Sequence, residues 1–279
     1  MNSKKNIIIY SLFAVVFIAC FVFYSILSKG KTYTNILYEI EYPSDTLFTE
    51  EEFSQYVKKV HSPVIGKLID SVNLSLFEKK IETFPYISNA DVINNRGTLL
   101  IKAKQEKIIA KIFNSKDEQF YLAKSGKLVP KSKSTAGRIL VVNGYINKQY
   151  SENQFVYNVC KNKNEEKNEK KKKEKTNYST LFLVWKIACF IENDPFWKAQ
   201  ISQLYVNSNQ DIELIPTVGE HVVLFGSISS LENIDKAIRQ KFNNLEYLYT
   251  DGFKITGWDK YKSINLKYGT EIPCERKNN

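Results

Sequence analysis

Residues 84–113 read FPYISNADVINNRGTLLIKAKQEKIIAKIF, and this stretch has a clear pattern of secondary structure. Pro85 ends a preceding helix, because proline cannot continue one. Residues 90–93 are typical of a strand, and residues 94–97 (NNRG) are typical of a turn. A returning strand follows, in which every second residue is apolar: Leu99, Ile101 and Ala103. The stretch therefore predicts a β-hairpin that follows a helix.

Two short amphipathic helices and a strand are expected before this hairpin. Thr49 with Glu52 is a capping-box pattern, and the apolar residues after it share one helix face: Phe53, Val57 and Val60. Ser75 with Glu78 repeats the capping pattern, and the second helix has its own apolar face: Leu74, Phe77, Ile81 and Phe84. Residues 35–42 alternate apolar and polar, as a half-buried strand does. In the order strand, helix, helix, strand, strand, the two helices must cover one face of a small sheet.

An uncharged, largely apolar stretch, residues 6–28, precedes this unit, with lysines on both sides. A helix needs about 20 apolar residues to cross a bilayer, so the stretch predicts a transmembrane helix. A cleaved signal peptide is one alternative, but its apolar core has only about 7–15 residues. A lipoprotein signal at Cys20 is another, but the apolar run continues beyond that residue. We expect an uncleaved anchor, with residues 1–5 as a cytoplasmic tail and the folded mass on the other side.

From residue 106 the pattern becomes β-rich. The expected strands are residues 110–113, 120–122, 138–144, 201–206, 212–215, 221–225 and 264–268. Residues 181–191 (LFLVWKIACFI) are too short to cross a membrane and predict a buried helix. A second helix face runs from Leu231 to Leu245. Residues 161–175 hold eight Lys, four Glu and three Asn, which predicts a disordered loop, with a polyanion-binding arm as the alternative.

Composition and motifs argue against several classes of function. The 279 residues carry a formal net charge of +10, and eight Lys against four Glu place +4 of it in residues 161–175, so the charge is poor support for nucleic-acid binding. H-E-x-x-H, C-x-x-C, G-x-S-x-G and glycine-rich phosphate loops are missing. The two histidines, His61 and His221, are far apart in sequence, and His221 is expected to be structural. We therefore predict no catalytic, cofactor-binding or metal-binding residues.

Three cysteines follow the expected anchor: Cys160, Cys189 and Cys274. An odd number allows at most one disulfide within the chain. Cys189 lies in the expected buried helix and is read as a buried thiol, and the sequence leaves a bridge between Cys160 and Cys274 open.

These features together resemble the FtsQ/DivIB family of bacterial cell-division proteins, with its POTRA domain. Residues 84–113 resemble that family's stretch from the second POTRA helix into its β domain. YLAKSGKLVP (121–130) is similar to the family's Tyr-x-Asp-x-x-Gly-x-x-x-Pro turn, with Ala123 in place of the acid. Residues 138–144 and 193–226 resemble the Bacteroidetes branch, and residues 257–274 resemble the C-terminal end of the family. The Lys/Glu/Asn insertion departs from the family pattern.

The resemblance implies an α+β protein made of several parts. These are a cytoplasmic tail (1–5), a transmembrane helix (6–28), a POTRA-like β-α-α-β-β domain (32–105), a mixed β-rich domain with a C-terminal edge strand (106–273) and a tail (274–279). It also implies a single-pass inner-membrane protein at the division septum, with its C-terminus in the periplasm. Such a protein is a non-enzymatic scaffold that recruits FtsB-like and FtsL-like coiled-coil proteins and uses no cofactor, nucleic acid or small-molecule substrate.

The partner surface is expected at the last strand, residues 264–268, because a terminal strand is a natural sheet edge. The residues expected to contact partners are Trp258, Tyr261, Ile264, Asn265, Leu266, Lys267 and Tyr268. The sequence leaves open whether Ile264 and Leu266 face the partner or the core, and whether Trp258 only packs a turn. The alternative functions are a membrane-anchored periplasmic enzyme and a surface sensor or adhesin with a POTRA-like domain.

Overall fold

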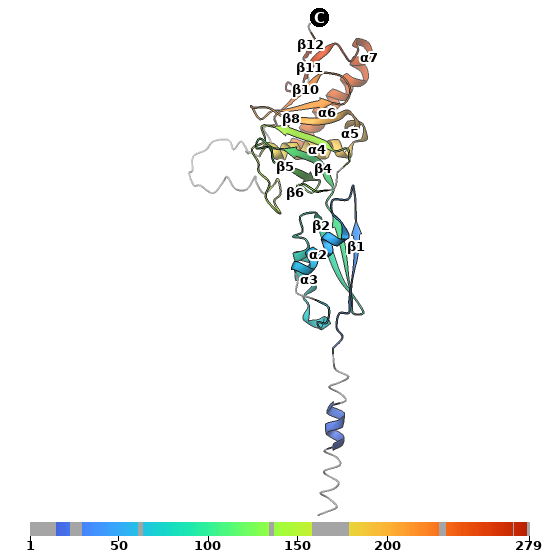
Figure 1. The fold of residues 1–279 in the computed structure, drawn as a ribbon. Coiled ribbons are helices and arrows are strands. Elements are labelled where there is room, and N and C mark those ends of the chain that lie inside the picture. The colour runs from blue at the N-terminus through green and yellow to red at the C-terminus, as the bar shows by residue number, and fades with distance from the viewer. Residues whose placement is uncertain are drawn as a thin grey trace, which may run out of the picture.

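The computed structural model describes residues 15–22, 30–60, 64–133, 137–157, 179–228, 233–269 and 271–277. A small three-stranded sheet and a large nine-stranded sheet follow one another end to end, with the C-terminal strand at the far end of the large sheet (Figure 1). Residues 15–22 are helical, and the rest of the expected transmembrane helix lies outside the described residues. None of the helices that the structure describes has the length and apolarity needed to cross a membrane.

The small sheet has the expected order of elements. Its strands and helices are β1 (Asn35–Glu41), α2 (Glu50–Val60), the short 3-10 helix η1 (Ile69–Ser71), α3 (Leu74–Ile81), β2 (Ile87–Asn95) and β3 (Thr98–Gln105). The strand order is β1-β3-β2, with β1 parallel and β2 antiparallel to β3. Helices α2 and α3 lie on one face, where Phe53, Phe77 and Ile101 are fully buried (Figure 1).

The two helix starts differ in how well the sequence predicts them. The capping box of α2 is confirmed, since Thr49 and Glu52 exchange backbone-to-side-chain hydrogen bonds of 3.2 Å. The capping box at Ser75 is wrong, because α3 begins at Leu74 and the side chain of Asn73 accepts the hydrogen bond from the Leu76 N–H at 2.9 Å. Glu78 instead accepts a hydrogen bond from the Val92 N–H at 2.9 Å, which ties α3 to β2.

Replacing Asn73 by Ala should lower the free energy of unfolding by about 1 kcal/mol, because the first turn of α3 loses its cap. Ser75→Ala is the matched control and should change it by less than about 0.5 kcal/mol. Urea unfolding of the two variants separates the two cap positions. Equal losses would show that Asn73 is not the cap.

The large sheet combines antiparallel hairpins with three parallel pairs. Its first strands are β4 (Ile108–Phe113), β5 (Gln119–Ala123), β6 (Leu128–Pro130) and β7 (Leu140–Gly144). They are followed by α4 (Thr180–Asn193), α5 (Pro195–Gln200), β8 (Ile201–Val206), β9 (Ile212–Pro216), β10 (Val222–Gly226), α6 (Ile234–Tyr247), the π-helical turn η3 (Leu248–Gly252), α7 (Phe253–Thr256), β11 (Tyr261–Asn265) and β12 (Cys274–Arg276). The strand order is β12-β11-β10-β9-β8-β7-β4-β5-β6.

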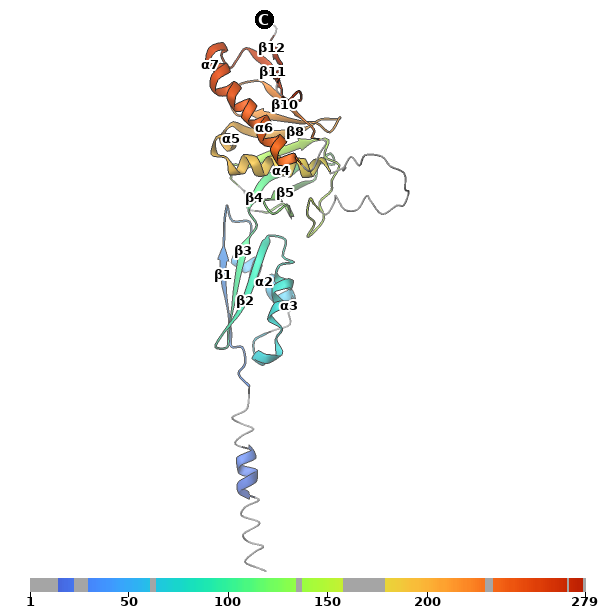
Figure 2. The ribbon, with the colours of Figure 1, turned by 180° about the vertical axis from the view of Figure 1, so that it is seen from behind.

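Helices cross one face of the large sheet because parallel strands need a crossover connection. Helices α4 and α5 connect β7 to β8, and α6 with α7 connects β10 to β11 (Figure 2). The expected buried helix is confirmed as α4, and the expected apolar face of α6 is confirmed by its buried residues: Ile234, Ile238, Phe242 and Leu245. Leu231, Cys160 and residues 161–175 lie outside the described residues.

The two sheets are joined by a short connection and a shared interior. Only Glu106 and Lys107 separate β3 from β4. Ile108, Tyr121 and Val129 of the large sheet belong to the same hydrophobic cluster as the buried aromatic residues of the small one. Lys127, which is only 4% exposed, donates hydrogen bonds from Nζ to the carbonyls of Ile87 (2.9 Å) and Phe84 (3.4 Å). The β5–β6 hairpin is therefore anchored in the small unit.

Candidate functional site

The C-terminal end of the large sheet differs from the prediction. Residues 264–268 are not an edge strand: β11 covers Tyr261–Asn265 and pairs with β10 on one side and β12 on the other. The expected tail 274–279 contains β12, which is the actual edge. A strand of three residues, Cys-Glu-Arg, has no apolar alternation, so its pattern could not reveal it.

Each sheet has two edge strands: β1 and β2 in the small sheet, and β12 and β6 in the large one. On two of these four strands, other groups of the protein occupy the outer backbone. On β2, the carboxylates of Glu78 and Glu82 accept hydrogen bonds from the N–H groups of Val92 and Ala90. On β6, the backbone of residues 154–156 covers the edge through hydrogen bonds of 2.8 and 2.9 Å. Within the described residues, no backbone pairs with the outer sides of β1 and β12. Unpaired strand edges are templates for adding a further strand.

The register shows which backbone groups of β12 face outward. Asn265 N–H donates to Pro273 O at 2.9 Å, and Lys277 N–H donates to Lys260 O at 3.0 Å. Residues directly opposite each other alternate between hydrogen-bonded and non-bonded pairs in an antiparallel ladder. Cys274 and Arg276, opposite Ile264 and Tyr261 in the register, therefore direct their N–H and C=O groups away from β11.

The predicted partner residues separate into buried and accessible groups. Ile264 and Leu266 are core residues, with 0% and 2% exposure, so the open question about these two is settled in favour of the core. Asn265 is half-buried, and its N–H is used in pairing with β12. Lys267 forms an ion pair with Asp211 at 2.6 Å, and Tyr268 is 64% exposed.

Trp258 and Tyr261 come together in an aromatic cluster beside the edge. Both half-buried rings contact Phe253, with ring centroids 5.0 and 5.5 Å away, and Trp258 also contacts Tyr249 at 4.8 Å. Trp258 thus packs on the π-helical turn and α7 while part of its surface stays accessible. Aromatic side chains of this kind are enriched where partners bind most tightly.

Charged residues on and around β12 were missed by the sequence reasoning. Glu275 accepts a hydrogen bond from Ser263 Oγ at 3.0 Å and lies 3.4 Å from Lys262 Nζ. Lys277 pairs with the exposed Glu220 at 2.6 Å. Arg276 is exposed. The only sequence signal for this segment is Pro273, which is compatible with a strand start, and that signal alone is weak.

Lys241 of α6 fixes the ends of two strands near this edge. Its Nζ donates to Phe225 O at 2.8 Å, beside the end of β10, and to Leu266 O at 2.6 Å, just beyond β11. Burial lowers the pKa of Lys241 to about 8; the nearby carboxylate of Asp211 raises it and the charge of Lys267 lowers it, both to a smaller extent. The side chain is therefore mostly charged at neutral pH. It connects α6 to the backbone at the end of β11.

Replacing Lys241 by Met should lower the free energy of unfolding by about 1–2 kcal/mol at neutral pH, because two carbonyls lose a donor. Between pH 8 and 10.5 the unfolded chain keeps a proton that the folded chain has lost, so the stability of the wild type relative to the variant should rise with pH. Urea unfolding across this window measures the difference, with the exposed Lys236→Met as control. A difference that falls with pH would contradict the assignment.

One histidine and two cysteines of the large-sheet unit lie within the described residues: His221, Cys189 and Cys274. His221 is buried, its Nε2 lies 2.7 Å from Tyr249 Oη, and burial lowers its pKa. Cys189 and Cys274 are free thiols, and burial raises the pKa of Cys189 to about 11. Across the described ranges, no three His, Cys, Asp or Glu side chains are grouped so that they could hold a metal ion.

The described residues thus define an α+β protein whose two sheets lie end to end, with unpaired backbone on the outer sides of β1 and β12 (Figure 1). A family model described as "FtsQ/DivIB, C-terminal related" matches residues 107–275, which is more than half of the chain and runs from the start of the large sheet into β12. The chain belongs to the FtsQ/DivIB family, whose members act in cell division and are generally non-enzymatic. A search of curated proteins found no match.

Proposed function

We propose that this protein is a non-enzymatic scaffold of the division machinery that takes up a partner strand on β12. The unpaired side of β12, inside the region that matches the family, is the observation that carries the proposal. An extended partner segment would pair with the outward N–H and C=O groups of Cys274 and Arg276. The proposed partners are FtsB-like and FtsL-like coiled-coil proteins, as the resemblance to the FtsQ/DivIB family implies.

Side chains beside the edge supply the specificity in this proposal. The accessible parts of Trp258 and Tyr261 form an aromatic surface near the start of β11, and the exposed Tyr268 lies beyond the other end of this strand. Glu275 and Arg276 place opposite charges on neighbouring positions of the strand. Complementary charges on the partner would fix its register, because like charges placed opposite each other are unfavourable.

Residues 6–28 are proposed to anchor the protein in the inner membrane in a single pass, with residues 1–5 in the cytoplasm and the C-terminus in the periplasm. Two observations support this. The stretch is uncharged, and residues 15–22 form a helix with exposed apolar side chains, including Val15, Phe17, Ile18 and Phe21. The POTRA-like unit (32–105) would then lie next to the membrane, and the β-rich unit (106–273) with β12 would lie beyond it.

A fluorescent fusion to the N-terminus in dividing cells tests the role and the location together. We expect a band at the division site, and filamentous cells when the protein is depleted. Copurification of the solubilised full chain with the FtsB-like and FtsL-like proteins of the same organism tests the partners. Uniform envelope fluorescence together with normal division after depletion would refute the proposal.

A further inference from the structure

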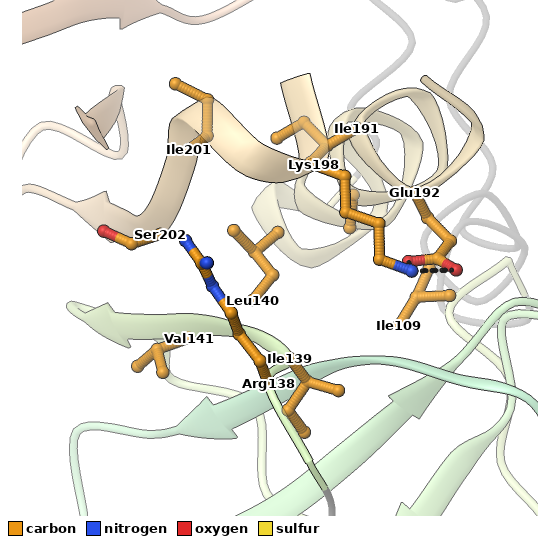
Figure 3. A pocket seen from close by; sticks show the side chains of 11 residues that line it. Ile109, Arg138, Ile139, Leu140, Val141, Ile191, Glu192, Lys198, Ile201 and Ser202 are labelled. Atoms are coloured by element: carbon orange, nitrogen blue, oxygen red, sulfur yellow. Dashed lines mark hydrogen bonds and ion pairs between the residues drawn. The ribbon is translucent and has the colours of Figure 1, made fainter. Parts of the chain in front are cut away.

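A second surface feature lies on the large sheet, away from β12. It is a pocket of about 230 Å³ between the starts of β7 and β8, the end of α4 and helix α5 (Figure 3). Neighbouring strands are about 4.8 Å apart, and four strand spacings separate β8 from β12, so the pocket lies roughly 19 Å from the edge. A ligand here would not touch the proposed partner strand.

The floor of the pocket is apolar and small. It is formed by side chains from three strands and one helix: Ile109, Leu140, Ala188, Ile191 and Ile201. Drug-sized ligands usually occupy about 300–1,000 Å³, which exceeds this volume. The space suits a single aliphatic side chain, and burying one such side chain contributes about 1.5–3 kcal/mol.

The rim of the pocket carries excess positive charge. Glu192 pairs with Lys107 Nζ at 2.8 Å and with Lys198 Nζ at 2.9 Å. Burial opposes ionisation of Glu192, but the hydrogen bonds and charges of these two lysines outweigh it and hold the pKa of Glu192 below its usual value. One carboxylate thus faces two ammonium groups before the nearby arginine is counted.

Arg138 stands at the mouth of the pocket with its charge uncompensated. Its Nη2 donates to Ala199 O at 3.3 Å and to Thr217 Oγ1 at 3.2 Å, which are both neutral acceptors. Within the part of the chain that the structure describes, no carboxylate forms an ion pair with Arg138. Figure 3 shows its guanidinium extending past Leu140 toward Ser202, while Lys198 and Glu192 pair on the other side.

We infer that this pocket binds a peptide segment of a partner protein, with an aliphatic side chain in the apolar floor and the carboxylate of the next residue on Arg138. Guanidinium groups bind carboxylates through two parallel hydrogen bonds, and such charge-assisted bonds are stronger than neutral ones. The partner motif is therefore an aliphatic residue followed by Asp or Glu. This site is independent of strand addition at β12.

Methyl NMR of the full chain in detergent micelles, with labelled isoleucines, tests the site. The probe is the capped peptide acetyl-Gly-Leu-Glu-Gly-amide, and two matched peptides replace its Glu by Gln or its Leu by Ala. At about 10 mM probe, the pocket methyl signals of Ile109, Ile139, Ile191 and Ile201 should shift, and that of Ile264 should not. Both matched peptides should bind about tenfold more weakly.

Arg138→Met should weaken the Leu-Glu peptide by about tenfold and the Leu-Gln peptide far less, since the neutral amide of Gln loses only weaker, neutral-acceptor hydrogen bonds. Arg239→Met, on the exposed side of α6, is the matched control and should change neither. Any of three results would overturn the inference. The pocket methyl signals do not shift, the Glu and Gln peptides bind equally well, or the Leu-Glu peptide binds Arg138→Met as tightly as the wild type. Tighter binding of free N-acetyl-leucine than of the peptide would overturn it too, because the pocket would then serve a small carboxylate.

Discussion

Arg276→Pro should weaken binding of the proposed FtsB-like and FtsL-like partners by about 30-fold or more while the thermal unfolding midpoint stays close to that of the wild type. Proline removes the outward N–H of Arg276, and its ring obstructs a strand that pairs there. Losing one ladder hydrogen bond and meeting a steric obstacle together cost about 2 kcal/mol, which corresponds to this factor. Titration of the solubilised full chain with each partner measures the change.

Arg276→Ala separates the backbone from the side chain at the same position. It keeps the N–H and removes only an exposed side chain, so partner binding should change far less than in the proline variant. Glu275→Pro provides the opposite control, because the Glu275 N–H faces β11 and its loss should lower the unfolding midpoint. Normal partner binding by a folded Arg276→Pro protein would rule out strand addition on β12.

Lys127→Met should lower the free energy of unfolding by about 2–4 kcal/mol. The carbonyl of Ile87 loses a buried donor, and Glu106, which is 3% exposed, loses a neighbouring positive charge. Burial raises the pKa of Glu106 and lowers that of Lys127, which means that it disfavours both charged forms. The charge of each residue stabilises the charged form of the other. Urea unfolding of the full chain measures the loss.

The exposed Lys116→Met is the control for Lys127→Met and should lie within about 0.5 kcal/mol of the wild type. In the double variant Lys127→Met, Glu106→Gln, the combined loss should be smaller than the sum of the single losses, because the uncompensated buried charge has been removed as well. Equal stability of the Lys116 and Lys127 variants would show that Lys127 does not hold the two units together.

Much of the architecture follows from local patterns. The alternation around residues 84–113, the capping box of α2 and the apolar run of α4 each predict the element that forms, because burial dictates the spacing of apolar residues. The cap of α3 is different. Both Asn73 and Ser75 are residue types that cap helices, but Glu78 accepts a hydrogen bond from the Val92 N–H of β2, the next strand, and Asn73 is the cap that forms.

The candidate site was harder to predict for a related reason. β12 has no pattern of its own and exists because Asn265, Ser263 and Lys260 offer partners to residues 273–277. The sequence therefore locates the right end of the sheet but the wrong strand. Likewise, nothing local indicates that Ile264 and Leu266 point into the core, since alternation does not say which face is covered.

The embedded β5–β6 hairpin has a mechanical consequence. The small and large sheets are expected to move little relative to each other. They are joined by a two-residue connection, a common hydrophobic interior and the hydrogen bonds of Lys127. We therefore expect the folded part to act as a rigid spacer, so that the partner proposed to bind β12 would be held at a set distance from the N-terminal end of the small sheet (Figure 1). A force on such a partner would be transmitted from β12 through both sheets to the N-terminal end of the small sheet.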